Sequence, residues 1–249
     1  MVARQPWRGR VSRDRLHALM AAKKKAARGP GRPRSGEAPA LDTEECLRVA
    51  LRVFADTGFE AASIRDIARR LGVSHALLRH HFGSKQQIWE ATVDFSFGSM
   101  NRELTARLQH ALTSRDLRAG LRSLIVEYVR LSAVFPDNLT LLMHESALGG
   151  ERMQYIVDRH VRAFVQVARG MVRHAQAEGA LRDAPWQAIF FLVFTGGPAV
   201  FAMSPLDRAL DDGGASPSDD VERYAEAIAT IVLDGILRVP ADTGAAQSR

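Results

Sequence analysis

The side chains best suited to chemistry in this chain lie close together in one short polar stretch. Ser74, His75, Arg79 and His80 occur within seven residues, and their hydroxyl, imidazole and guanidinium groups all form hydrogen bonds. Arg79 follows His75 by four residues, so a helix would present both on one side. Such groups can bind phosphate oxygens or the acceptor atoms on base edges. The stretch therefore predicts a surface that binds nucleic acid.

Two short helices are expected to position these side chains. Ser63 is a typical N-cap for a helix over residues 64–71, in which the apolar residues recur at helical spacing. Gly72 follows, where a left-handed residue can end the helix. Ser74 can then cap a second helix over residues 75–81. Two short helices joined by a three-residue turn that contains glycine form a helix-turn-helix, whose second helix enters the major groove.

Longer helices are expected on both sides of this pair. Residues 43–56 carry an apolar stripe, and Gly58 would end that first helix. Ser84, with Gln87 three residues later, forms a capping box that starts a fourth helix. This fourth helix is expected to reach about Leu112 and to link the DNA-binding part rigidly to the rest of the chain.

Residues 43–90 resemble the DNA-binding domain of TetR/AcrR-family transcriptional regulators. The resemblance implies an all-α fold with an N-terminal three-helix helix-turn-helix DNA-binding domain over residues 41–90. It also implies a larger C-terminal helical domain for ligand binding and dimerisation, over residues 91–239. The matching segments are Phe54-Ala-Asp-Thr-Gly58-Phe59, Ser63-Ile-Arg-Asp-Ile-Ala68, Gly72-Val-Ser74 and His80-x-Phe82-x-Ser84-Lys85.

The resemblance also indicates which residues contact DNA. In this family the positions of His80 and Lys85 commonly touch backbone phosphates. The positions of Ser63 and Arg65 commonly do the same. Many members have tyrosine where this chain has Arg79, so Arg79 either replaces an aromatic phosphate contact or reads guanine O6 and N7. The complete set of DNA contacts predicted for this domain is Thr43, Ser63, Arg65, Ser74, His75, Ala76, Leu77, Arg79, His80 and Lys85.

The positive charge of the chain is concentrated at its N-terminus. Residues 1–40 contain 11 Lys/Arg and 2 Asp/Glu, whereas residues 41–90 contain seven of each. Residues 91–249 contain 16 Lys/Arg and 19 Asp/Glu. Because glycine and proline are frequent near its end, residues 1–40 are expected to form a flexible basic arm. An arm of this kind suits a polyanion such as nucleic acid.

One short motif in the arm suggests how it would contact DNA. Gly31-Arg32-Pro33-Arg34 resembles the core of AT-hook motifs. A thin extended backbone flanked by Arg32 and Arg34 can follow the narrow, strongly negative minor groove of A·T-rich DNA. The alternative is a solvated tail that makes no specific contact.

The C-terminal domain is predicted to be helical throughout, because no window shows sustained alternation of polar and apolar residues. Residues 240–249 are expected to be a disordered tail, and residues 211–218 a disordered loop. The two last helices are the predicted dimer surface, since the resemblance implies that they pair with their copies in a partner subunit. The predicted helices span residues 117–135, 139–148, 151–178, 186–203 and 219–238.

Within those two last helices, apolar residues at helical spacing define the predicted dimer faces. The alternative is that these residues pack only inside their own subunit. The residues concerned are Phe190, Phe194, Ala199 and Phe201 in residues 186–203, and Ala225, Ile228, Ala229, Val232 and Ile236 in residues 219–238.

The resemblance further implies a cavity for a small-molecule effector in the C-terminal domain. Aromatic and methionine side chains at helical spacing are candidates for its walls, although such residues more often form ordinary core. No metal site or cofactor is expected, because the zinc-protease-like His144-Glu145 pair has Leu148 where a second histidine is needed. The candidate ligand-binding residues are Phe97, Met100, Tyr128, Arg130, Met143, His144, Phe164, Phe190 and Phe194.

Together these features predict a sequence-specific, DNA-binding transcriptional regulator. The most economical form is a ligand-responsive repressor that binds a pseudo-palindromic operator as a homodimer. A single cysteine, Cys46, and the lack of a long apolar run fit a cytoplasmic, nucleoid-associated protein without a membrane span. Two alternatives remain open: a non-specific architectural DNA-binding protein, and an enzyme that uses the helical body cavity. No catalytic motif supports the enzyme.

Overall fold

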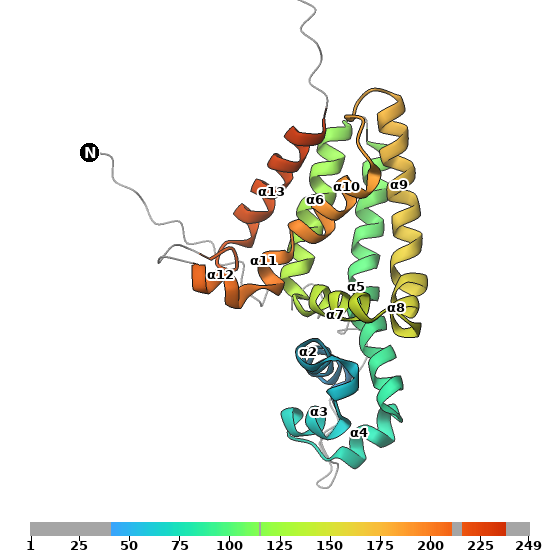
Figure 1. Ribbon diagram of the computed structural model, residues 1–249, viewed down its shortest axis with the longest axis vertical. Helices are drawn as coiled ribbons and strands as arrows, with labels where there is room; N and C mark the ends of the chain where they lie inside the picture. Colours follow the sequence, from blue (N-terminus) through green and yellow to red (C-terminus); the bar gives the residue numbers. More distant parts are fainter. Residues whose placement is uncertain (1–40, 115, 211–215, 238–249) are drawn as a thin grey trace, which may run out of the picture. The chain divides into compact units, whose positions relative to one another are not determined.

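The structure is a computed structural model that describes residues 41–114, 116–210 and 216–237 (Figure 1). Within these residues every regular element is a helix, and one isolated β-bridge joins Leu181 to Leu237. The predicted all-α fold is confirmed. The basic arm with Arg32 and Arg34 lies outside the described residues, as do most of the predicted loop and the C-terminal tail.

The first part of the described chain, residues 41–90, is called the head here, and residues 91–237 the body. The head contains three helices and the beginning of a fourth. Helix α5 passes without a break from the head into the body, as predicted for the linking helix (Figure 1). The four helices are α2 (Thr43–Ala61), α3 (Ile64–Leu71), α4 (His75–Phe82) and α5 (Lys85–Thr113).

Short polar residues begin these helices at the predicted positions. The hydroxyl oxygen of Ser63 accepts a hydrogen bond from the amide of Asp66 at 3.1 Å, and Ser74 caps α4 in the same way. Ser84 and Gln87 form the complete predicted capping box. Caps of this kind typically stabilise a helix by about 1 kcal/mol each. The local start signals in the sequence are therefore confirmed.

Two glycines end or bend helices of the head. Gly72 has φ 68° and ψ 25°, the left-handed conformation predicted for the end of α3. Gly58 has φ 72° and ψ 166°, so the regular part of α2 stops there, as predicted. The helix resumes for one more turn as far as Ala61, which the sequence pattern did not indicate.

The body is built from the remaining helices. Residues 151–178 and 186–203 were each expected to form one unbroken helix, but a π-helical turn interrupts both. Such turns carry one residue more than a regular α-helical turn. The helices are α6 (Leu117–Val134), α7 (Asp137–Leu148), α8 (Glu151–Ile156), η2 (Val157–Val161), α9 (Arg162–Ala177), α10 (Trp186–Phe191), η3 (Leu192–Gly196), α11 (Ala199–Ala202), α12 (Ser204–Leu210) and α13 (Val221–Ile236).

Helix α12 was not predicted, because Pro205 was interpreted as a break. Pro205 instead occupies the first turn of this helix, where proline lacks only an amide hydrogen that would be unpaired anyway. None of the helices that the structure describes combines the length and the apolar character needed to cross a membrane.

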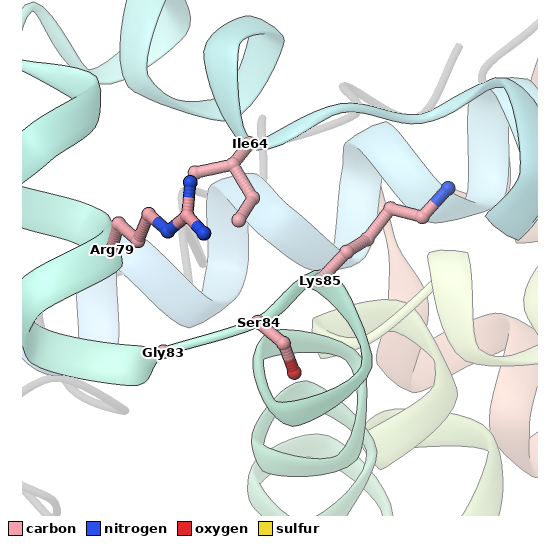
Figure 2. A pocket seen from close by; sticks show the side chains of 5 residues that line it. All are labelled: Ile64, Arg79, Gly83, Ser84 and Lys85. Carbon is pink, nitrogen blue, oxygen red and sulfur yellow. The ribbon is translucent and has the colours of Figure 1, made fainter.

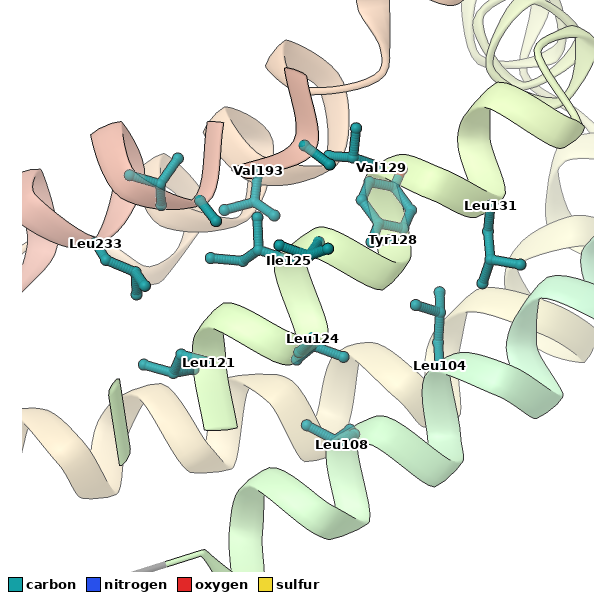
Figure 3. Packing of buried hydrophobic residues seen from close by; sticks show 14 of the residues in the cluster. Leu104, Leu108, Leu121, Leu124, Ile125, Tyr128, Val129, Leu131, Val193 and Leu233 are labelled. Atoms are coloured by element: carbon teal, nitrogen blue, oxygen red, sulfur yellow. The ribbon is translucent and has the colours of Figure 1, made fainter. Parts of the chain in front are cut away.

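The main hydrophobic core lies where α6 packs between α5 and α13 (Figure 3). Leucines of α5 and α6 face each other, and Val193 and Leu233 close the core from η3 and α13. The long α5 thereby has one end in the head and the other fixed in the body core. The residues labelled in the figure are Leu104, Leu108, Leu121, Leu124, Ile125, Tyr128, Val129, Leu131, Val193 and Leu233.

Candidate functional site

Helix α4 carries the predicted DNA-binding residues on its exposed face. Leu78 is 1% exposed and anchors the helix in the head core. Ala76, Arg79 and His80 are exposed, and Leu77 retains 36% of its accessible surface. An anchored helix with an exposed polar face is the arrangement that allows side chains to enter a DNA groove.

Arg65 and Arg79 differ from the other arginines of α3 and α4. Both are exposed, and neither forms an ion pair with any residue that the structure describes. In contrast, Arg69 pairs with Asp66, and Arg70 pairs with Asp56 at 3.1 Å. The positive charges of Arg65 and Arg79 are therefore available to a phosphate or a base.

A surface hollow of about 500 Å³ adjoins Arg79 (Figure 2). Its guanidinium group extends from α4 toward Ile64 at the start of α3, and Gly83 and Ser84 line the other side. The hollow thus lies where the end of α4 and the beginning of α5 meet the beginning of α3, beside the exposed face of α4.

Ser63 uses its hydroxyl group inside the head. The oxygen accepts the amide of Asp66 and the hydroxyl hydrogen is donated to the carboxylate of Asp66 at 2.5 Å. This hydrogen bond, followed by the charge of Arg69, lowers the pKa of Asp66 below its usual value. A phosphate contact by Ser63 therefore stays a prediction. The Ser63 hydroxyl would have to contact the phosphate while it also caps α3.

The side chain of Lys85 extends in a different direction from that of Arg79 and contacts other residues of the head (Figure 2). Its ammonium group donates to the carbonyl oxygens of Phe59, Glu60 and Ala62 at 2.9, 3.2 and 3.2 Å. These are carbonyls at the end of α2, which lack helical partners and attract a cation. In the structure Lys85 therefore holds the end of α2, and the phosphate contact predicted from the sequence stays a prediction.

Thr43 lies beside the end of α4, although it is 38 residues away in sequence from His81. Its hydroxyl group is 3.2 Å from the Nε2 atom of His81. His75 is half-buried at the beginning of the same helix. The structure therefore gathers Thr43, Ser74 to Leu77, Arg79 and His80 on or beside α4.

The body contains a cavity of about 40 Å³ between α5, α6 and α7. Phe97, Met100 and Tyr128, three of the predicted ligand-binding residues, line it. The other residues that line the cavity were not predicted from the sequence. They come from the end of α6, the beginning of α7 and one proline before α11. These are Ser132, Phe135, Pro136, Asn138, Leu139, Leu142 and Pro198.

The other predicted ligand-binding residues do not line this cavity. Arg130 is paired with Glu222 at 2.8 Å, and Met143 and His144 are exposed on α7. These residues do not share one pocket in the structure, because Arg130 is paired with a carboxylate on α13 and Met143 and His144 are exposed; their role in ligand binding stays a prediction. Phe164, Phe190 and Phe194 instead form an aromatic cluster next to Tyr128, with ring centroids 4.4–5.3 Å apart around Phe194.

Helices α7 and α8 connect the body to the head. Glu145 is 1% exposed, and its carboxylate accepts hydrogen bonds from Nε of Arg152 at 3.1 Å. The guanidinium of Arg152 lies 4.2 Å from the ring centroid of Phe59, and the ammonium of Lys85 lies 4.4 Å from it. Cations within about 6 Å of an aromatic ring are attracted to its face. This set of four residues, the Phe59 cluster, joins α7 and α8 to the end of α2.

A second polar cluster joins α5 to α8 and η2. Asp94 of α5 accepts from the hydroxyl of Tyr155 at 3.1 Å and lies 2.7 Å from Nε2 of His160. Arg159 adds an ion pair at 3.0 Å. Burial, followed by the charge of Asp94, raises the pKa of Tyr155 to about 12, so its hydroxyl keeps its proton at neutral pH.

Four of the nine residues predicted for the dimer faces are buried within their own subunit, which corrects that part of the prediction. Ala225, Ala229, Val232 and Phe201 are at most 5% exposed and belong to the core of their own subunit. The period of the apolar residues had identified the side of each helix that faces inward. Other apolar residues of the same region remain exposed, namely Phe191, Leu192, Met203, Leu206, Leu210 and Ile231.

Comparison with known proteins relates this geometry to established families. A sequence model described as bacterial regulatory proteins, tetR family, matches residues 47–92, which include α3, α4 and the start of α5. The HTH-type transcriptional regulator BetI of Rhizobium meliloti (strain 1021) is 37% identical over 89 residues, which are 36% of this chain. The match covers 43% of that relative, which is less than half of its length.

The likeness to two other regulators extends over the body. The HTH-type transcriptional repressor KstR2 of Rhodococcus jostii (strain RHA1) is 29% identical over 205 residues, or 77% of this chain and 89% of that protein. The solved structure of the ketosteroid transcriptional regulator KstR2 of Mycobacterium tuberculosis superposes with a TM-score of 0.62 at 20% identity. It covers 83% of this chain and all of that one, so head and body share the fold of that regulator.

Proposed function

We propose that this chain is a transcriptional repressor of the tetR family of bacterial regulatory proteins, which its head matches, and that it binds its operator through α4. Two copies would bind a pseudo-palindromic operator, and a small-molecule effector would release them. The observation that carries the proposal is Arg79, which is exposed on a core-anchored helix and forms no ion pair with any described residue. Relatives named as repressors support repression rather than activation.

On DNA, α4 would lie in the major groove. The free amides at its N-terminus, next to Ser74, would bind a backbone phosphate. Arg79, one turn after His75, would reach either guanine or a second phosphate. Arg65 at the beginning of α3 would add a further phosphate contact, because its charge is available too.

Dimerisation would use the exposed apolar residues of α10 to α13. Phe191 is 61% exposed and Ile231 is 70% exposed. Large apolar side chains gathered on one region commonly mark a protein interface. A two-fold dimer would then place two α4 helices in successive major grooves, about 34 Å apart.

Effector response would depend on α7, which has one side on the cavity and another on the head. Leu139 and Leu142 line the cavity. On the head side, Asp137 lies 3.6 Å from Arg52 of α2, and the exposed imidazole of His144 lies near Gly58. A ligand that widens the cavity would displace α7, and with it the Phe59 cluster and the head. Release requires that the ligand favours the spacing of the heads that does not fit DNA.

The N-terminal arm would add affinity that depends on salt. Eleven basic residues against two acidic ones make residues 1–40 a strong cation, and each phosphate contact displaces counterions from DNA. Arg32 and Arg34 would enter an A·T-rich minor groove beside the operator.

The proposal is tested by selection from random duplex DNA with the full-length protein at near-physiological salt. The bound pool is sequenced, and the selection is repeated with a version of the protein that begins at Leu41. We expect both proteins to enrich one inverted repeat, with A·T-rich flanks only for the full-length chain. Enrichment of no sequence by either protein would contradict the proposal and favour non-specific architectural binding through the arm.

A further inference from the structure

The body cavity contains a buried amide group that has no hydrogen-bond partner among the described residues. Asn138, in the first turn of α7, is 3% exposed and lines the cavity. Neither its Oδ1 nor its Nδ2 atom forms a hydrogen bond with any residue that the structure describes. Because buried polar groups are almost always paired, an amide left with two unpaired atoms requires an explanation.

The hydroxyl hydrogens of the two other polar side chains of the cavity are already used. The hydroxyl of Ser132 donates to the carbonyl of Tyr128 at 2.8 Å, and the hydroxyl of Tyr128 donates to the carbonyl of Phe194 at 2.8 Å. Asn138 therefore provides the free side-chain donor among the residues that line the cavity, with a free acceptor beside it. An amide can give and receive one hydrogen bond on the same side.

No carboxylate, ammonium or guanidinium group is among the residues that line the cavity. Tyr128 is the ionisable side chain there, and burial raises its pKa, so it stays neutral. A charged ligand would lose its hydration without gaining an opposite charge, which is strongly unfavourable. The walls otherwise consist of aromatic, leucine, methionine and proline side chains.

We propose that Asn138 is the polar anchor of the effector site, and that the effector is an uncharged, mainly apolar molecule whose polar group both accepts and donates a hydrogen bond, such as a carboxamide. This inference rests on the ligand response in the proposed function. The cavity of about 40 Å³ has room for little more than one water molecule. Binding a larger molecule therefore requires Leu139 and Leu142 of α7 to move outward, on the helix that contacts the head.

Three unbranched probes of eight carbon atoms each test the chemical class: octanamide, octanoate and octylamine. Each is titrated into the full-length protein without DNA, and binding is measured by calorimetry and by the shift of the melting temperature. We expect octanamide to bind and to raise the melting temperature. The two charged probes should bind at least about tenfold more weakly, because nothing in the cavity compensates their charge.

Asn138→Leu tests the anchor, since leucine has nearly the same size and no polar atoms. We expect the free variant to melt at the same or a higher temperature than the wild type, because an unpaired amide is removed. Its preference for octanamide should disappear. Asn101→Leu is the matched control, since Nδ2 of Asn101 donates to the carbonyl of His160. This control should melt at a lower temperature and keep the preference.

The outcomes separate this inference from the proposed function. If Asn138→Leu melts clearly lower and the wild type does not prefer octanamide, the amide binds a structural water and the inference is overturned. If the wild type selects an inverted repeat but does not bind octanamide, the inference fails while the proposed function stands. If no operator is selected, the proposed function fails, and calorimetry still decides whether Asn138 binds the uncharged probe.

Discussion

Arg79 and Arg70 are both exposed arginines of the head, but their surroundings give them different roles. Arg70 neutralises Asp56 at 3.1 Å, and an exposed pair of this kind contributes little to stability. Arg79 lies on α4 and pairs with no described carboxylate. The cost of removing water from the free guanidinium of Arg79 would be compensated by the negative charge of DNA phosphates. Arg79 is therefore a stronger candidate for a DNA contact than Arg70.

We expect Arg79→Ala to weaken binding to the selected operator by about 1–3 kcal/mol. If Arg79 reads guanine, the preference for one base pair relaxes. If it contacts phosphate, affinity falls equally for all sequences. Binding is measured by fluorescence anisotropy, with Arg173→Ala on α9 as the control that removes the same charge. Equal affinities for the two variants would remove Arg79 from the interface.

Lys85→Met separates the structural role of Lys85 from the phosphate contact that the sequence suggested. Three hydrogen bonds to the end of α2 are lost, so the free energy of unfolding should fall by about 1–3 kcal/mol. The salt dependence of operator binding should stay the same. Urea unfolding and salt titrations measure the two effects. An unchanged stability, together with a salt slope reduced by about one, would restore the phosphate contact.

Single residues were predictable where the signal is local. Ser63, Ser74 and Ser84 cap helices that begin directly after them, so the sequence alone identified them. The contacts of Lys85 with the end of α2 were not predicted, because its partners lie 23 to 26 residues away and are backbone atoms. Asn138 was missed because an asparagine near a helix start is ordinary, and only the packing around it leaves its amide unpaired.

At the scale of elements, a few interactions in α3 and in the turn after it fix the position of α4. Gly72 provides the left-handed turn, and the amide of Val73 donates to the carbonyl of Ala68 at 3.1 Å. The start of α3 depends on the Ser63 and Asp66 pair. Because α3 packs against α4, the hydrogen bonds of this cap also help to hold the exposed face of α4 in position.

The cap of α3 should give the protein a dependence on acid pH. Because the pKa of Asp66 is lowered in the folded state, its stabilising effect is fully present above the unfolded value of about 3.9. The effect is lost as the pH falls through the folded value. Asp66→Asn should therefore be less stable than the wild type at pH 7, and the difference should shrink below about pH 4. Asp183→Asn, at an exposed turn, is the control, and a difference that does not change with pH would contradict this role.

Element types were more predictable than their interruptions. Residues 117–135 and 139–148 form helices close to the predicted bounds. The π-helical turns at η2 and η3 were missed, because an extra residue in a helix leaves no compositional signal. At η2 the extra residue accompanies the contact of His160 with Asp94, so tertiary packing, not local preference, decides the geometry.

On the scale of the whole molecule, the proposed dimer depends on which apolar residues α6 leaves uncovered. Helix α13 packs Ala225, Ala229 and Leu233 against its own subunit, which leaves Ile231 outside. The sequence could identify α13 as amphipathic but not the side that its neighbours would cover. The packing of α6 against α13 decides which face of α13 is buried.

Ile231→Glu is expected to dissociate the dimer. Burying one isoleucine contributes about 1.5–3 kcal/mol, and two-fold symmetry makes the loss count twice. Sedimentation at micromolar concentration should show a monomer that keeps its helical circular dichroism. Leu148→Glu, at a residue of α7 that is 69% exposed, is the control and should remain a dimer. A variant at Ile231 that stays dimeric would move the interface elsewhere.

The central claim is that two α4 helices, fixed in one dimer, bind two half-sites on the same face of DNA. The most direct test compares the selected operator with one in which about five base pairs, half a helical turn, are inserted between its half-sites. With the full-length protein at one salt concentration, the affinity for the altered operator should fall to that for a single half-site. Equal affinity for both operators would show that the heads bind independently, and would contradict the account.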